Sequence, residues 1–133
     1  MSQKTFVFLK PDAVRRGLIG RILSRFEEKG LTIVEAKMMT ISHVLSDLHY
    51  EEHVTKGFYP ELRNYVTSGP VLAAVIEGPN AVDLVRMMVG ATDPAKSAPG
   101  SIRGDFGLHL GENVIHASDS IESAGREMKN FFG

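Results

Sequence analysis

The sequence predicts an α+β fold in which a four-stranded antiparallel sheet carries helices on one face. Two observations lead to this class. The periodic segments follow the order strand, helix, strand, helices, strand, helix, strand, helix, and the two middle strands are joined by more than a tight turn. With 133 residues, the chain is too short for a doubly wound sheet and suits a single core. We therefore expect one domain over residues 1–133, built as a ferredoxin-like α/β sandwich.

The first three elements are the clearest. Residues 4–9 have β-type composition and are apolar on both alternating faces, as a central strand should be. Apolar residues then recur at helical spacing from Leu18 to Phe26, and Gly30 suits the C-cap of that helix. In residues 31–41, small and apolar side chains alternate with Glu35 and Lys37, which predicts a half-exposed strand.

The middle of the chain is less regular. Residues 43–67 predict two short helices, broken around Gly57 to Pro60. Residues 71–76 form a short apolar run that predicts a buried strand. Asn80 can cap a helix that ends at Gly90.

The last third begins with a long segment of little periodicity, residues 91–112, rich in glycine. A loop of this length in a compact domain is more often functional than idle. Val114 and Ile115 predict a short strand that leads into a final helix over residues 121–131. Asp119 and Glu122 have the spacing of a capping box for it.

Composition narrows the function classes. Fifteen Lys and Arg against sixteen Asp and Glu leave a net charge of −1, without the basic excess of most nucleic-acid binders. An anionic ligand must therefore be held by a local cluster of cations, which favours a small molecule over a polymer. The chain has no cysteine and no apolar run of about 20 residues, so we expect no disulfide and no membrane span. The N-terminus lacks a secretory pattern, and we expect a cytoplasmic protein.

Four residues could carry chemistry by position alone. His116 lies where a short strand ends and a helix begins, where free backbone N–H groups favour anions. Taken alone, a histidine there is more often a buried structural residue. Lys10, Arg86 and Arg103 fall at the ends of predicted elements and could converge, although each alone would be read as a surface cation. Common phosphate-binding signatures, a P-loop and a G-x-G-x-x-G turn, are absent from the sequence.

Several segments together carry a resemblance that spans essentially the whole chain. Asn113-Val114-Ile115-His116-Ala117-Ser118-Asp119 resembles the active-site signature of the nucleoside diphosphate kinase family. The further matching segments, in family order, are Phe8-Leu9-Lys10-Pro11-Asp12, Arg16-Gly17-Leu18-Ile19-Gly20, Tyr65-Val66-Thr67-Ser68-Gly69-Pro70-Val71, Gly90-Ala91-Thr92-Asp93-Pro94 and Pro99-Gly100-Ser101-Ile102-Arg103-Gly104-Asp105-Phe106. The resemblance implies a ping-pong kinase that moves the γ-phosphate of a nucleoside triphosphate, mainly ATP, to a nucleoside diphosphate.

The resemblance also implies residue roles. His116 would become the phosphohistidine, with Glu127 and Ser118 orienting its ring and Tyr50 beside it. For the nucleotide, the implied contacts are Arg86, Thr92 and Arg103 with the phosphates (and His53 in some members), Lys10 and Asn113 with the ribose, and Phe58 with the base, near Leu62 and Leu110. Stacking on Phe58 without hydrogen bonds to base edges predicts broad base specificity. Mg²⁺ would be carried by the nucleotide phosphates, without a protein ligand.

The resemblance further suggests a homo-oligomer, and the sequence leaves hexamer and tetramer open. Lys56-Gly57 departs from the Arg-Pro pair of many members, which predicts a more mobile helical hairpin. Two other functions are compatible with the fold. A non-enzymatic ligand-sensing module is possible because a fold does not dictate function. A nucleic-acid-binding or regulatory role is disfavoured as the primary function by the balanced charge.

Overall fold

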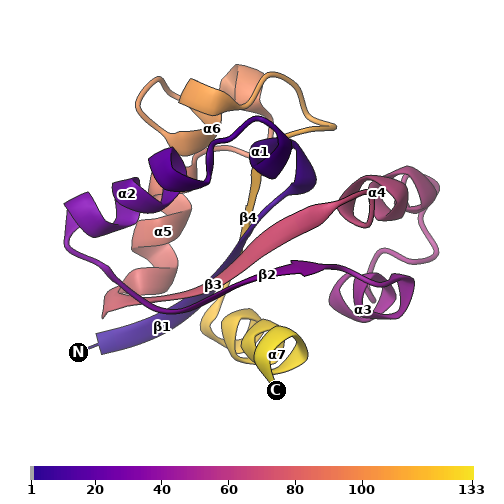
Figure 1. Cartoon of the computed structure of the whole chain (residues 1–133), viewed down its shortest axis with the longest axis horizontal. Coiled ribbons are helices and arrows are strands. Elements are labelled where there is room, and N and C mark those ends of the chain that lie inside the picture. The colour runs from indigo at the N-terminus through magenta and orange to yellow at the C-terminus, as the bar shows by residue number, and fades with distance from the viewer. Residues whose placement is uncertain (1) are drawn as a thin grey trace.

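A computed structural model describes residues 2–133. Its centre is a four-stranded sheet of order β2-β3-β1-β4 in which every neighbouring pair is antiparallel. The strands are β1 (Ser2–Leu9), β2 (Thr32–Thr40), β3 (Pro70–Pro79) and β4 (Ile115–Ala117) (Figure 1). The prediction of a four-stranded antiparallel sheet in an α+β chain is therefore confirmed.

The helices are short. They are α1 (Pro11–Arg15), α2 (Ile19–Lys29), α3 (His43–His49), α4 (Tyr59–Val66), α5 (Ala81–Val89), the 3₁₀ helix η1 (Pro94–Lys96), α6 (Ile102–Phe106) and α7 (Ile121–Phe132). The break between α3 and α4 covers residues 50–58, so it includes Gly57 but begins earlier than predicted and ends before Pro60, which lies in the first turn of α4. The predicted loop 91–112 contains η1 and α6. Among residues 2–133, no helix has both the length and the apolar character needed to cross a membrane.

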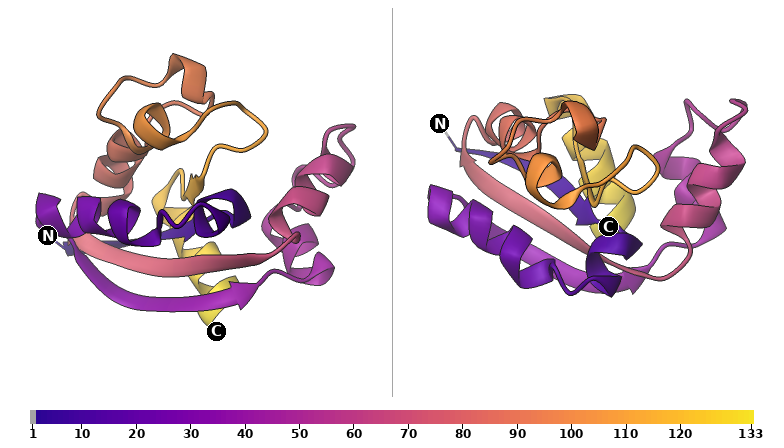
Figure 2. Two further views of the ribbon diagram at one scale, coloured as in Figure 1. Left: turned by 45° about the horizontal axis from the view of Figure 1, so that its top comes forward. Right: turned by 90° about the horizontal axis from the view of Figure 1, so that it is seen from above.

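The helices lie on both faces of the sheet, which corrects the prediction that they lie on one. Val7 and Leu9 of β1 belong to a core that includes buried residues of α2 and α5, whereas Phe6 and Phe8 belong to a second core that includes Phe131 of α7. Figures 1 and 2 show α7 on the side of the sheet opposite to α2 and α5. The cause is visible in β1, which is apolar on both faces and so must be covered twice.

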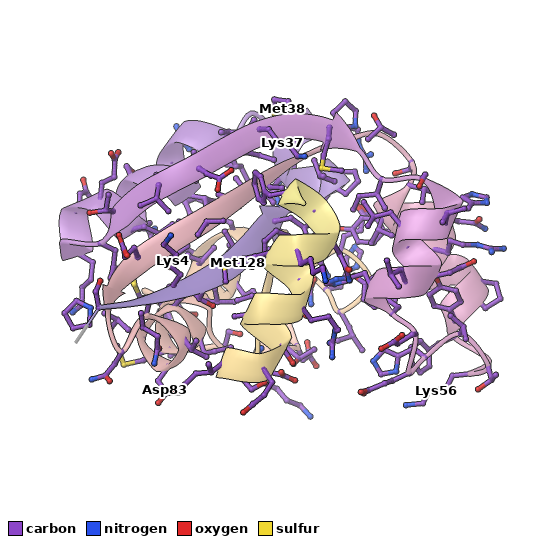
Figure 3. All side chains as sticks on the ribbon, turned by 90° about the horizontal axis from the view of Figure 1, so that it is seen from below. Lys4, Lys37, Met38, Lys56, Asp83 and Met128 are labelled. Atoms are coloured by element: carbon purple, nitrogen blue, oxygen red, sulfur yellow. The ribbon has the colours of Figure 1, made fainter. Side chains whose placement is uncertain are left out.

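The outer strand β2 is more exposed than predicted. A half-exposed strand was predicted, but Val34, Ala36 and Met38 are all exposed in the single chain, and Met38 retains half of its accessible surface. The pairing with β3 is shifted by a bulge between Ile33 and Glu35. Figure 3 shows Lys37 and Met38 on this strand, with Met128 on the α7 helix that crosses the sheet. β2 thus presents a free edge with exposed apolar side chains.

Two of the predicted caps differ from the structure, and one is confirmed. Gly30 ends α2 in the left-handed conformation, at φ 100°, as predicted. Asn80 precedes α5 but makes no side-chain cap, and Gln3 Oε1 accepts from the Val82 amide instead. Ser120, rather than Asp119, caps α7, by accepting from the Ser123 amide at 3.0 Å. A predicted cap can therefore be replaced by a side chain distant in the sequence or by the next residue.

Candidate active site

A cleft of about 960 Å³ opens beside β4. The α3–α4 hairpin, the segment from Thr92 to Asn113 and the first turns of α7 contribute to its walls. Of the thirteen predicted site residues, twelve line it: Lys10, Tyr50, His53, Phe58, Leu62, Arg86, Thr92, Arg103, Leu110, Asn113, His116 and Glu127. Ser118 is buried behind Glu127. The structure thus brings together residues that are spread over more than a hundred positions.

The His116 side chain lies on β4, in the strand position opposite Phe8 of β1. Its ring stacks on the Phe8 ring, with centroids 5.2 Å apart and planes at 28°. The side chain keeps 21% of its accessible surface, on the cleft side. The Phe8 ring on one side holds the imidazole in place, and the cleft on the other side leaves it accessible.

A tight turn directly before β4 sets the position of His116. Val114 has φ 64°, rare for a β-branched residue, and the Ile115 amide donates to the Asn113 carbonyl at 2.8 Å, as in a γ-turn. Arg103 holds both ends of this turn: its Nε donates to the Asn113 carbonyl at 3.4 Å and its Nη2 to the Ile115 carbonyl at 2.6 Å. Such strain persists only where its surroundings hold it, and it marks functional sites.

Glu127 of α7 fixes the orientation of the His116 ring. Its Oε1 lies 2.8 Å from His116 Nε2 and accepts from Ser118 Oγ at 2.6 Å. Burial alone would raise the Glu127 pKa, but the contacts with His116 and Ser118 outweigh it and hold the pKa below its usual value. Because an ionised carboxylate can only accept, Nε2 carries the proton and Nδ1 keeps a free lone pair.

The imidazole of His116 is held in its neutral form. Burial lowers its pKa most strongly, and the positive charges of Lys10 and Arg103 lower it further, whereas Glu127 opposes them. A pKa below 6.5 means that the ring is mostly uncharged at neutral pH. Among residues 2–133, no group donates a hydrogen bond to His116 Nδ1, so the lone pair of this nitrogen is free. A neutral imidazole with a free lone pair has the chemistry that a nucleophile requires.

His49, at the end of α3, is a neighbour that the sequence reasoning missed. Its ring meets the His116 ring edge-on, with centroids 4.6 Å apart, and it lines the same cleft. Burial, followed by the proximity of His116, lowers its pKa to about 3, so it is neutral. The Tyr50 ring packs edge-on against it at 4.5 Å, and burial raises the Tyr50 pKa. The position next to Tyr50 was the only available signal for His49.

The cations predicted from the ends of the elements do converge. Lys10 Nζ donates to Asn113 Oδ1 at 2.7 Å, and Asn113 Nδ2 donates to the Thr92 carbonyl at 3.0 Å. Burial, reinforced by Arg103, lowers the Lys10 pKa to about 7. Burial and the neighbouring Arg86 lower the Arg103 pKa to about 10. Cations that lower one another's pKa are poised for an anion that would neutralise them.

Tyr65 and Asp12 also support this cationic end, and the sequence reasoning did not identify either. The Tyr65 hydroxyl donates to Asp12 Oδ1, and the Lys10 ammonium lies 5.8 Å from the centre of the Tyr65 ring. Asp12 is buried, with its other carboxylate oxygen unpaired among the described residues. Both residues fall within quoted motif segments, but their types alone gave no role.

The other end of the cleft is apolar and open. Phe58 keeps 54% of its accessible surface and Leu110 keeps 59%. Leu62 lies in α4, four residues after Phe58, which is the N-cap of that helix. The His53 ring centre lies 5.6 Å from that of Phe58, and its Nδ1 is buried without a partner among the described residues. Exposed apolar side chains on facing walls suit a flat ring that stacks between them.

Comparisons with known proteins agree on one family. The model of the family described as nucleoside diphosphate kinase matches residues 3–133. The nucleoside diphosphate kinase of a Nocardioides species is 60% identical over 99% of this chain and 98% of its own length. The nucleoside diphosphate kinase of Saccharolobus solfataricus is 58% identical over 99% of this chain and 96% of its own length.

Solved structures agree as well. The nucleoside diphosphate kinase of Halobacterium salinarum, in complex with CDP, has a TM-score of 0.96 at 48% identity and covers 99% of this chain and 88% of its own. The nucleoside diphosphate kinase of Aquifex aeolicus has a TM-score of 0.96 at 41% identity and covers 100% of this chain and 96% of its own. The likeness therefore extends over the sheet, the cleft and both termini of the described chain.

Proposed function

This chain belongs to the nucleoside diphosphate kinase family, and from that premise we propose that His116 carries the phosphate between the two nucleotides. The activity is transfer of the terminal phosphate of a nucleoside triphosphate to a nucleoside diphosphate, in two half-reactions that share one site. The observation that supports His116 most strongly is its hydrogen bond through Nε2 to Glu127, which leaves Nδ1 as a free nucleophile facing the cleft.

In the first half-reaction, the Nδ1 lone pair attacks the γ-phosphorus. The N–P bond forms as the bond from phosphorus to the β–γ bridging oxygen breaks, and the diphosphate leaves with that electron pair. The ring becomes cationic, and its Nε2–H stays bonded to the Glu127 carboxylate, which stabilises the charge. In the second half-reaction, a terminal β-phosphate oxygen of another diphosphate attacks the same phosphorus and Nδ1 recovers its lone pair.

The cationic end of the cleft holds the phosphates. Phosphoryl transfer requires positioning and charge neutralisation more than acid or base chemistry. Arg86, Thr92 and Arg103 would contact the phosphates, with His53 as a secondary contact. Burial, and after it the neighbouring cations, lower the pKa values of Lys10 and Arg103, and a bound polyphosphate would favour the charged form of both.

The cleft fits a divalent metal that arrives with the nucleotide. The cations that line the cleft, Lys10, Arg86 and Arg103, offer no lone pair to a metal in their charged forms. We propose Mg²⁺ as the metal, held by nucleotide phosphates without a protein ligand. It would neutralise phosphate oxygens, while the protein's own residues orient the chain of phosphates toward His116.

The ribose and base occupy the rest of the cleft. Lys10 and Asn113, joined by a hydrogen bond, would meet the ribose hydroxyls, and the base would stack on Phe58 beside Leu62 and Leu110. Every base has a π face, so this arrangement supports broad specificity. Tyr50, packed against His49, would lie beside the reacting phosphate.

We also propose that the protein is a homo-oligomer. The free edge of β2, with Val34 and Met38 exposed, supports this proposal because long apolar edges are normally covered. The choice between hexamer and tetramer is a matter for mass measurement in solution.

A matched pair of histidine variants tests the role of His116. His116→Ala should abolish transfer from ATP to CDP, because no other nucleophile replaces Nδ1. His109→Ala removes an exposed histidine that lines the same cleft on a loop, and should retain most of the activity. Steady-state rates of CTP formation decide the matter, and undiminished transfer by His116→Ala would overturn the proposal.

A further inference from the structure

We propose that His49, His116 and Glu127 form a zinc site that competes with phosphorylation of His116. The zinc site stands on its own geometry, whereas the competition rests on the proposed function. One ring nitrogen from each histidine and one Glu127 oxygen lie within 4.8 Å of one another. Two histidines and a glutamate are the ligand set of a family of zinc sites that leave the fourth position open.

The ligand atoms need only small movements to reach a metal. A tetrahedral zinc with bonds of about 2.0–2.1 Å places its ligands about 3.4 Å apart. His116 Nε2 and Glu127 Oε1, at 2.8 Å, are already close to this separation. The His49 nitrogen would have to move by up to about 1.4 Å to complete the set.

A second observation is independent of that spacing. His49 keeps only 6% of its accessible surface, and its Nδ1 is buried without a hydrogen-bond partner among residues 2–133. A neutral imidazole with an unpaired buried nitrogen normally costs free energy, because its desolvation is not compensated. A metal bonded to Nδ1 would remove that penalty.

The surroundings also meet the requirements of a metal site beyond its ligands. Ser118 Oγ donates to the ligand carboxylate of Glu127 at 2.6 Å and so fixes its orientation. Phe8 packs against both imidazoles, with ring centroids 5.6 Å from His49 and 5.2 Å from His116. The cleft provides the entry path and room for a water as the fourth ligand. Lys10 and Arg103 oppose a cation here, so we expect binding weaker than that of a structural zinc site.

Zinc and phosphate would exclude each other through the tautomer of His116. Coordination at Nε2 replaces the proton that Glu127 holds there. The displaced proton moves to Nδ1 or to solvent. With the proton on Nδ1, the ring has no lone pair for the γ-phosphorus. With the proton lost to solvent, the positive metal withdraws the electron density that the attack requires.

Calorimetry with Zn²⁺ and the nucleotide-free wild-type protein tests the site, with Co²⁺ as a spectroscopic probe. We expect one Zn²⁺ per chain and the intense visible bands of four-coordinate Co²⁺. His49→Gln should weaken Zn²⁺ binding at least about tenfold. The matched control is His43→Gln, which removes an exposed histidine from the start of the same helix and should bind as the wild type does.

Equal Zn²⁺ affinity in His49→Gln and the wild type would overturn the proposed zinc site. The weak visible bands of six-coordinate Co²⁺ in the wild-type protein would also overturn it, and this measurement requires no variant. Competition is measured as the rate at which γ-labelled ATP labels the protein with Mg²⁺ in excess. For each variant, the rate with zinc is compared with the rate of the same variant without zinc. Zinc that binds but leaves labelling unchanged would overturn the competition. Failure of the zinc-free wild type to be labelled would instead count against the proposed function, because calorimetry is read without ATP.

Discussion

The Nε2 atom of His116 lies 2.8 Å from Oε1 of Glu127, and this contact determines which ring nitrogen keeps a free lone pair. Glu127 is ionised because its hydrogen-bond partners outweigh its burial. It therefore fixes the proton on Nε2 and leaves the lone pair of Nδ1 free. The sequence identified both residues, but only their contact in the structure assigns a tautomer.

Glu127→Gln tests this contact. An amide can donate as well as accept, so the tautomer is no longer fixed, and we expect the labelling rate to fall about 10- to 100-fold. The Glu127 carboxylate raises the His116 pKa, so its removal lowers that pKa and moves the acid limb of the pH–rate profile to lower pH. An unchanged rate with an unchanged acid limb would contradict the assignment. Ser118→Ala, which removes only a partner of Glu127, should have a smaller effect.

Lys10 should take up a proton when a nucleotide binds. Its pKa of about 7 means that at pH 8 most of the free protein carries a neutral Lys10, whereas bound phosphate favours the charged form. Calorimetry of ADP binding at pH 8, in buffers of different ionisation enthalpy, should show uptake of nearly one proton. Lys10→Met should abolish the uptake and weaken binding about 10- to 150-fold. Equal uptake in that variant would assign the proton to another group.

Phe58 should contribute equally to the binding of all nucleotides, whichever base they carry. Loss of an aromatic stacking partner costs about 1–3 kcal/mol per base, so Phe58→Ala should raise KM about 5- to 150-fold for every diphosphate. Phe58→Trp keeps a π surface and should largely preserve KM. The measurement is KM for ADP, GDP, CDP and dTDP as acceptors. A rise confined to one base would show selective recognition and contradict the stacking account.

Two glycines should respond to alanine in opposite directions. Gly125 lies within α7, and a Cβ there would meet open space, so Gly125→Ala should stabilise the fold by about 1 kcal/mol. Gly90 has φ 94°, and a Cβ there would lie 2.7 Å from Ser101 Oγ, so Gly90→Ala should destabilise the fold. Denaturant unfolding at a fixed protein concentration measures both. A Gly125→Ala variant less stable than the wild type would contradict the open packing around α7.

Local pattern predicted much of the fold and failed where tertiary contacts decide. The strands, the α3–α4 break and the Gly30 cap follow from periodicity and glycine chemistry. The sequence also showed β1 to be apolar on both faces, yet the expected single layer of helices overlooked what that requires. Gln3 capping α5 could not be foreseen, because the contact spans 79 residues.

The candidate site divides in the same way. Motif resemblance identified twelve of the residues that line the cleft, because the types and spacing of these residues are specific. It did not identify His49, whose importance comes only from its ring packing against His116. Nor could it predict the γ-turn at Val114, since nothing in a valine indicates a positive φ. The brace from Arg103 that holds this turn is likewise a tertiary feature.

The most direct test of the central claim is to mix the purified protein with γ-labelled ATP and Mg²⁺ in the absence of an acceptor. We expect acid-labile, alkali-stable label on the protein, attached to Nδ1 of His116. Added GDP, CDP or dTDP should chase it into the corresponding triphosphate, and His116→Ala should remain unlabelled. Label that persists in His116→Ala, or nucleotide exchange without any labelled protein, would contradict transfer through this histidine.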